Sequence, residues 1–202
     1  MAILKVARMG HPVLRLEAQP VRPEDIATAG FQRFCNDLLE TMIEYDGAGL
    51  AAPQVHVPLR VAVLTLDGED EPRFFVNPEV TPLGEGTART WEGCLSVPGF
   101  RGLVERPDKV RVRALMRDGS EYDEVLEGFS AVVVQHEFDH LDGVLYVDRV
   151  LPRSLLFLEE YRRWGPPEEY AEVEAYEDEE GFIDDDDDDE EDTVPSASVT
   201  EA

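Results

Sequence analysis

The sequence has few of the features that mark secreted or membrane proteins. It contains only two cysteines, Cys35 and Cys94, and neither lies in a CxxC pair, so a disulfide framework is excluded and a reducing compartment is expected. No segment approaches the roughly 18 apolar residues of a membrane span, and the N-terminus has no continuous apolar core of signal-peptide length. These absences predict a soluble, cytoplasmic protein that does not bind membranes.

Basic residues are absent from residues 165–202, which contain 18 acidic residues, nine of them consecutive at positions 184–192. This stretch supplies most of the net charge of −27, because residues 1–164 contain 27 acidic and 18 basic residues. Like charges at this density repel and stay solvated, so we expect one folded domain, 1–164, followed by a disordered acidic tail, 165–202. The acidic balance also argues against specific binding to nucleic acid, which requires a basic surface.

The pattern of apolar residues predicts an α+β fold in which antiparallel sheets pack around a central helix, with an amphipathic helix nearer the N-terminus. Residues 1–23 contain three prolines and are expected to be extended, whereas residues 23–45 carry an apolar stripe at helical spacing that includes Cys35. Strands are expected at 61–66, 74–80, 109–115 and 121–126, with turns at Asn77–Pro78 and 117–120. The central helix should begin at Ser130 and end before Gly143, and a shorter helix is expected within 151–164.

The central helix carries the clearest chemical signal, QHEFDHLDG at residues 135–143. His136 and His140 are four residues apart and therefore lie on one helical face, with Glu137 beside them. Two imidazoles can bind one divalent metal while the carboxylate acts on a water molecule. Catalytic sites of this kind usually take a third ligand from the protein, so another donor is expected elsewhere in the chain.

Two candidates for the third ligand stay open on the residues alone. Cys94 offers a thiolate, which suits zinc, ferrous iron or cobalt, and it is the donor that we favour. Glu159 or Glu160 follows the helix at a separation typical of some HExxH peptidases, although a solvated helix face explains this pair more simply. Asp139, beside His140, could orient a ligand or could instead be solvated or cap the helix, and the loop residue His56 is expected to be solvated.

Three motifs together resemble the signatures of the peptide deformylase family. They are GAGLAAPQ at 47–54, EGCLSVPG at 92–99 and the helix motif at 135–143, and GHPVLR at 10–15 is similar to the family's opening segment. The likeness extends over residues 3–164. Family members remove the formyl group from the N-terminal methionine of newly made bacterial and organellar proteins, and the resemblance implies this activity here.

The resemblance also implies roles for individual residues. The metal ligands would be Cys94, His136 and His140, and Glu137 would be the general acid and base. Gln54 and the backbone N–H of Leu95 would receive the carbonyl oxygen of the substrate. The metal would be ferrous iron in the cell, with zinc, nickel or cobalt as substitutes.

The substrates implied by the resemblance are N-formyl-methionyl peptides and nascent chains, bound as an added extended strand. Residues matching positions along that path are Ala48, Gly49, Thr90 and Arg101. Ala48 stands where many members carry a larger β-branched residue, and Thr90 where an apolar residue is commoner, so we expect a wider pocket with a weaker preference for methionine. Some members dock on the ribosome through a basic C-terminal helix. An acidic tail cannot do this against RNA, so any transient ribosome contact is expected elsewhere on the protein.

Two other functions remain as alternatives. An HExxH metallopeptidase would use Glu159 or Glu160 as its third ligand and would cleave internal peptide bonds. A relative without catalytic activity would bind formylated peptides without hydrolysing them, but Glu137 and every other proposed catalytic residue are present.

Overall fold

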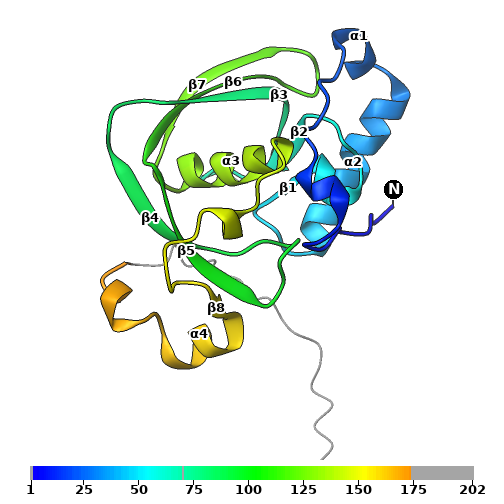
Figure 1. Cartoon of the computed structure of the whole chain (residues 1–202). Helices are drawn as coiled ribbons and strands as arrows, with labels where there is room; N and C mark the ends of the chain where they lie inside the picture. Colours follow the sequence, from blue (N-terminus) through cyan, green and yellow to red (C-terminus); the bar gives the residue numbers. More distant parts are fainter. Residues whose placement is uncertain (1, 70, 174–202) are drawn as a thin grey trace, which may run out of the picture.

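Two antiparallel sheets and a central helix form the protein in the computed structural model, which describes residues 2–69 and 71–173 (Figure 1). The five-stranded sheet has the order β1-β2-β3-β6-β7, and the three-stranded sheet has the order β4-β5-β8. The strands of the first sheet are β1 (Gly49–Ala51), β2 (Val61–Leu64), β3 (Arg73–Pro82), β6 (Lys109–Leu115) and β7 (Glu121–Glu127). Those of the second are β4 (Thr87–Glu92), β5 (Phe100–Pro107) and β8 (Leu156–Phe157). The expected α+β architecture is confirmed.

Four α-helices and four short 3-10 helices accompany the sheets within the described residues. The α-helices are α1 (Pro23–Ile26), α2 (Ala29–Glu44), α3 (Gly128–Leu141) and α4 (Leu158–Trp164). The 3-10 helices are η1 (Pro12–Arg15), η2 (Ala52–Val55), η3 (Tyr146–Asp148) and η4 (Glu168–Tyr170). No helix in the described part of the chain is long and apolar enough to cross a membrane. Most of the expected tail, residues 174–202, lies outside the described residues.

Helix α3 is held by burial rather than by helix propensity. Eleven of its 14 residues are buried, and its β-branched run at 132–134 disfavours helix slightly, so packing must outweigh the local preference. Figure 1 shows α3 surrounded by strands of both sheets. The predicted end is correct, because Gly143 follows the helix with a φ of +72°. The predicted start was wrong: Glu127 is the N-cap, and the Ser130 hydroxyl accepts the Asp67 N–H at 2.9 Å instead.

The helix expected at 23–45 is in fact two helices. α1 ends at Ile26, and Thr28 begins α2 by accepting the Phe31 N–H at 3.3 Å with its side chain. A threonine at this position offers the backbone an alternative partner and so ends one helix and caps the next. The apolar stripe of α2 is buried as predicted, and burial raises the pKa of the Cys35 thiol to about 11, which makes it an inert core residue.

Several strands and helices differ from the sequence prediction. Asn77–Pro78 is not a turn: β3 continues through it with a register shift between Val76 and Glu79, and the Asn77 side chain accepts the N–H and donates to the carbonyl of Val21. Strands β1, β4 and β5 were not expected. Only residues 158–164 of the expected last helix are helical, because β8 occupies the two residues before them. At the other end of the chain, η1 interrupts the N-terminal segment that was expected to be extended.

Candidate metal centre

Three potential metal ligands from two parts of the fold meet beside α3. Single donor atoms of Cys94, His136 and His140 all lie within 4.8 Å of one another, and Cys94 Sγ is 3.3 Å from His140 Nε2. The two histidines lie one turn apart on α3, whereas Cys94 follows strand β4 of the smaller sheet. One thiolate and two imidazoles suit a borderline divalent metal such as zinc or ferrous iron, so these residues fit a metal site.

The alternative glutamate ligands do not join this cluster. Glu159 and Glu160 are exposed in the first turn of α4, and neither belongs to any potential metal-binding group in the described residues. His56 is also outside it, because it is exposed at the end of η2 with its ring 4.6 Å from that of His11. The structure therefore brings Cys94 to the two histidines and leaves the peptidase-type ligands apart.

His136 is oriented by a buried carboxylate that the sequence analysis did not single out. Its Nδ1 lies 2.8 Å from Glu92 Oε2, which leaves Nε2 for a metal. Arg106 donates to both oxygens of Glu92, from Nε at 2.6 Å and from Nη2 at 2.9 Å. Burial would raise the pKa of Glu92, but the hydrogen bonds with His136 and Arg106 hold it at about 2. Glu92 is therefore a fixed negative charge behind the histidine.

The charged chain continues outward from Arg106 to the molecular surface. Arg106 Nη1 donates to Asp139 Oδ2 at 2.8 Å, and Arg149 donates to both oxygens of Asp139 at 2.7 Å. Asp139 is thus neither solvated nor a helix cap, and it is linked to His136 only through Arg106 and Glu92. The sequence offers one hint of this arrangement: Thr90 and Glu92 are two residues apart, so a strand places both side chains on the same face. Nothing in the sequence around Arg106 indicates that its side chain is buried.

The two histidines differ in their proton affinity. Burial and the nearby charge of His136 push the pKa of His140 well below its ordinary value, so His140 is a neutral imidazole. Burial also opposes charge on His136, but hydrogen bonds with Cys94 and Glu92 outweigh it and raise the pKa of His136 well above its ordinary value. A metal bound by His136 would take the place of the proton on its ring, so metal binding should release protons.

Glu137 lies beside the cluster in a space that only a glycine leaves open. A Cβ atom added to Gly49, in β1, would come within 2.6 Å of Glu137 Oε1. Glu137 is 4% exposed, and its Oε2 has no hydrogen-bond partner within the described part of the chain. Burial raises the pKa of this carboxyl group to about 7, so it can accept and return a proton near neutral pH.

The Gln54 side chain is fixed with its amide group toward Cys94. Its Oε1 accepts the Ala51 N–H at 2.8 Å, and its Nε2 donates to Ser96 Oγ at 3.3 Å and to Cys94 Sγ at 3.5 Å. Leu95 lies between these two partners in a turn closed by the Val97 N–H and the Cys94 carbonyl at 2.8 Å. The Gln54 amide therefore meets the turn that carries Leu95 at Cys94 and Ser96.

The other residues expected along the substrate path differ in their exposure and contacts. Ala48 is exposed next to Gly49, and Arg101, on β5, has its Nη1 3.0 Å from where a Gly93 Cβ would stand. Thr90 is 3% exposed and its hydroxyl donates to Glu92 at 3.5 Å, so this hydroxyl is turned toward the charged chain behind His136.

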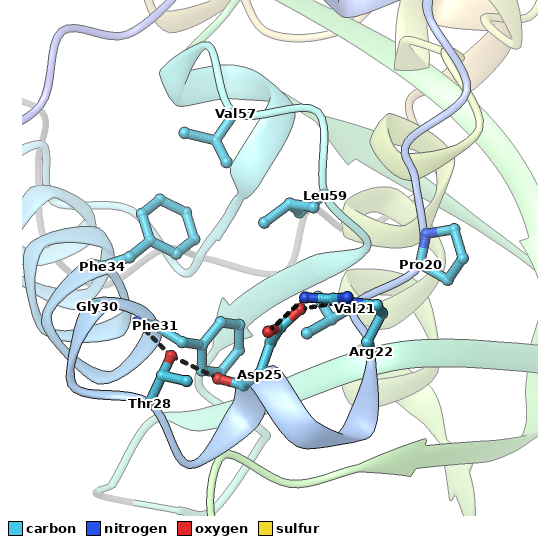
Figure 2. A pocket seen from close by; sticks show the side chains of 10 residues that line it. All are labelled: Pro20, Val21, Arg22, Asp25, Thr28, Gly30, Phe31, Phe34, Val57 and Leu59. Carbon is cyan, nitrogen blue, oxygen red and sulfur yellow. Dashed lines mark hydrogen bonds and ion pairs between the residues drawn. The ribbon is translucent and has the colours of Figure 1, made fainter.

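A separate open hollow of about 620 Å³ lies away from the cluster (Figure 2). It lies between the start of α2 and the chain after η2, and an Arg22–Asp25 ion pair stands at its rim. Its main apolar walls are Phe31, Phe34, Val57 and Leu59. None of its lining residues belongs to the metal centre.

Comparisons with known proteins agree on one family. The family model described as "Polypeptide deformylase" matches residues 3–155. A peptide deformylase of Leptospira biflexa is 43% identical over 164 residues, covering 77% of this chain and 92% of that protein, and one of Pseudomonas aeruginosa is 50% identical over 149 residues, covering 73% and 87%.

Solved structures give the same result. The actinonin-bound class I type b peptide deformylase from Acinetobacter baumannii is 37% identical with a TM-score of 0.70, covering 75% of this chain and 100% of that one. The peptide deformylase from Thermotoga maritima is 38% identical with a TM-score of 0.71, at the same coverage. The same A. baumannii protein has also been solved with Met-Ala-Ser bound.

Proposed function

This chain belongs to the polypeptide deformylase family of hydrolases, whose members remove N-terminal formyl groups from newly made proteins, and we propose from this premise which of its residues carry out each step. The observation that supports the proposal most strongly is the meeting of Cys94, His136 and His140 within 4.8 Å, with the buried Glu137 beside them.

Cys94, His136 and His140 would hold one divalent metal per chain. Ferrous iron is our proposal for the native metal, with zinc, nickel or cobalt as working substitutes, because a thiolate with two imidazoles suits all of these ions. When bound, the metal supplies Lewis acidity and lowers the pKa of a water at the site. Glu92 holds His136 in the tautomer that presents Nε2, and Arg106 keeps Glu92 in place.

Glu137 is the proposed general base and acid. It takes a proton from the attacking water as the water oxygen bonds to the formyl carbon, and it then delivers that proton to the amine nitrogen as the carbon–nitrogen bond breaks. The products are formate and a free N-terminus. A carboxyl group with a pKa of about 7 suits both transfers at neutral pH.

Gln54 and Leu95 are the proposed donors to the formyl oxygen. Negative charge develops on this oxygen as the water attacks, and the Gln54 Nε2 and the Leu95 N–H would donate to it. The Ala51 N–H fixes the orientation of the Gln54 amide, so no reorganisation is needed during the reaction. Removal of one such donor typically lowers the rate by ~10²- to 10³-fold.

The proposed substrates are N-formyl-methionyl peptides and nascent chains. β1 is the end strand of its sheet and, among the described residues, pairs with β2 alone, so an extended peptide can add to its other edge beside Gly49. The binding of Met-Ala-Ser by the A. baumannii protein supports this substrate class. Ala48 would give the methionine side chain a wider pocket than usual, whereas Thr90 is buried with its hydroxyl toward Glu92 and is not proposed to widen it. Arg101 would lie along the peptide path.

The test is to identify the product. Anaerobically purified protein with measured metal content is incubated with formyl-Met-Ala-Ser, and formate and free amines are quantified. Stoichiometric release of formate and Met-Ala-Ser is expected. Cleavage of a peptide bond without formate would indicate a metallopeptidase, and binding without either product would indicate a non-catalytic relative; both results would overturn the proposal.

A further inference from the structure

A short N-terminal segment bridges the two loops that form the proposed binding site for the formyl oxygen. The Ala7 N–H donates to the Gln54 carbonyl at 2.7 Å, and the Met9 N–H donates to the Ser96 carbonyl at 2.7 Å. Residues two apart in the chain are separated by no more than ~7 Å, so these bonds hold two distant loops close together. We call residues 6–9 the strap.

The two residues held by the strap are those whose side chains meet. Gln54 Nε2 donates to Ser96 Oγ at 3.3 Å, and the strap binds the backbone carbonyl of each residue. Gln54 lies in η2, directly after β1 of the five-stranded sheet, whereas Ser96 follows β4 of the three-stranded sheet. The two sheets share no strand, so the position of one loop relative to the other depends on contacts such as these.

The strap is itself anchored at both ends. Before it, the Leu4 N–H donates to Thr41 Oγ1 of α2 at 2.9 Å. Ala7 is 2% exposed and belongs to an apolar cluster that includes Val97, just after Ser96, and Leu14 of η1. The strap is therefore tied to α2 and to the apolar cluster as well as to the two loops, so it cannot shift freely with either loop.

We propose that the strap is a positioning element that sets where the Gln54 amide stands relative to Cys94 and Leu95. This inference rests on the proposed function, because it concerns the donors to the formyl oxygen. A donor displaced by about 1 Å from its productive position can cost on the order of 10²-fold in rate, whereas ground-state binding of the peptide depends on other contacts. Loss of a strap bond should therefore lower kcat and leave KM and metal affinity nearly unchanged.

The test uses proline, which removes a single backbone N–H. Met9→Pro removes the bond to Ser96, and the exposed Met9 side chain contributes little packing. Arg8→Pro is the matched control: Arg8 is also exposed, and its N–H donates to no residue of the described part of the chain. Each variant is made in the wild-type protein and in a Gln54→Ala background, and kcat, KM, metal content and thermal unfolding are measured.

We expect Met9→Pro to lower kcat by about 10- to 100-fold with KM within threefold and full metal content, and Arg8→Pro to stay within twofold of wild type. In the Gln54→Ala background Met9→Pro should cost less than threefold, because the group that the strap positions is gone. An equal loss in both backgrounds would overturn the proposal, as would equal effects of the two prolines, loss of the metal, or failure of Met9→Pro alone to fold. Failure of the proposed function is distinct: wild-type protein would then release no formate, or Gln54→Ala alone would have full activity.

Discussion

Glu92 Oε2 and His136 Nδ1 are 2.8 Å apart, and this contact ties a proposed metal ligand to a buried arginine. Glu92→Ala should lower metal affinity by about 10- to 100-fold, because His136 loses the acceptor that fixes its orientation. It should also destabilise the metal-free protein by about 3–5 kcal/mol, because the Arg106 charge stays buried without its main partner. Competition with a chelator and urea unfolding measure the two effects. Unchanged metal affinity would contradict the assigned role of Glu92.

Glu137 should make the metal-free protein less stable as the pH rises. Because its pKa is about 7 in the folded chain, against about 4.3 when solvated, the unfolded chain loses this proton first. Ionisation between these values therefore favours unfolding and costs up to about 4 kcal/mol above pH 7. Glu137→Gln has no ionisable group at this position, so its free energy of unfolding should not show this loss. Without metal, the variant should therefore gain stability relative to wild type between pH 4 and pH 7.5, by about the free energy that ionisation of Glu137 costs. Urea unfolding across the pH range checks this, and a difference that does not change with pH would contradict the burial of an ionisable Glu137.

Gly49 should not accept even one methyl group. An alanine Cβ there would stand 2.6 Å from Glu137 Oε1, so Gly49→Ala must displace the carboxylate. We expect kcat to fall by about 10²-fold while the metal is retained. Gly30→Ala is the control, because a Cβ at Gly30 in α2 meets nothing within 4 Å. Formate-release kinetics on both variants decide the matter: comparable activities would show that the two glycines are equally tolerant.

Ala48 should set the selectivity for the first side chain of the peptide. We expect the wild-type protein to discriminate only weakly between formyl-Met and formyl-Leu or formyl-Phe peptides. Ala48→Ile should strengthen the preference for methionine by about 10-fold or more, since one methylene in such a pocket changes the ratio of kcat/KM by ~10-fold or more. Ratios of kcat/KM on matched tripeptides measure this. The hypothesis of a wide pocket fails should Ala48→Ile leave these ratios unchanged.

Residues after Val173 should be dispensable for catalysis and for any contact with the ribosome. A chain ending at Val173 should keep kcat/KM within twofold and bind ribosomes as the full chain does, because an acidic tail repels RNA. Ending at Trp164 instead should cost about 1 kcal/mol of stability, because the Tyr170 hydroxyl donates to the Pro152 carbonyl at 3.0 Å. Cosedimentation and thermal unfolding measure both; loss of ribosome binding on truncation at Val173 would show that the tail is the docking element.

Local patterns predicted the parts of the fold that local sequence controls. The spacing of His136 and His140 on one face of α3 and the alternation along β6 both follow from the period of a single element. The Glu92–Arg106 pair could not be predicted in this way, because it depends on how β4 and β5 pair with each other and pack against α3. The pair Asn77–Pro78 is typical of a turn. Its actual place in an irregular strand depends on Val21, which is 56 residues earlier in the chain and cannot be found from the local pattern.

The same distinction between local pattern and tertiary packing applies to the metal centre. The three motifs predicted Gln54, Cys94 and the two histidines as site residues. Each motif belongs to a different part of the fold, so their meeting depends on tertiary packing. Thr28 shows the converse, because this capping residue stands in the sequence just before the apolar stripe that begins at Phe31 and marks the start of α2, although one helix was expected over 23–45.

The most direct test of the account compares metal content and formate release in Cys94→Ala and Glu137→Gln with those of wild type, all prepared anaerobically. Glu137→Gln should retain one divalent metal per chain and lose turnover by at least about 10²-fold, because the proton acceptor is gone. Cys94→Ala should lose the metal, since only two ligands remain. Full turnover by Glu137→Gln, or full metal retention with normal turnover by Cys94→Ala, would contradict the account.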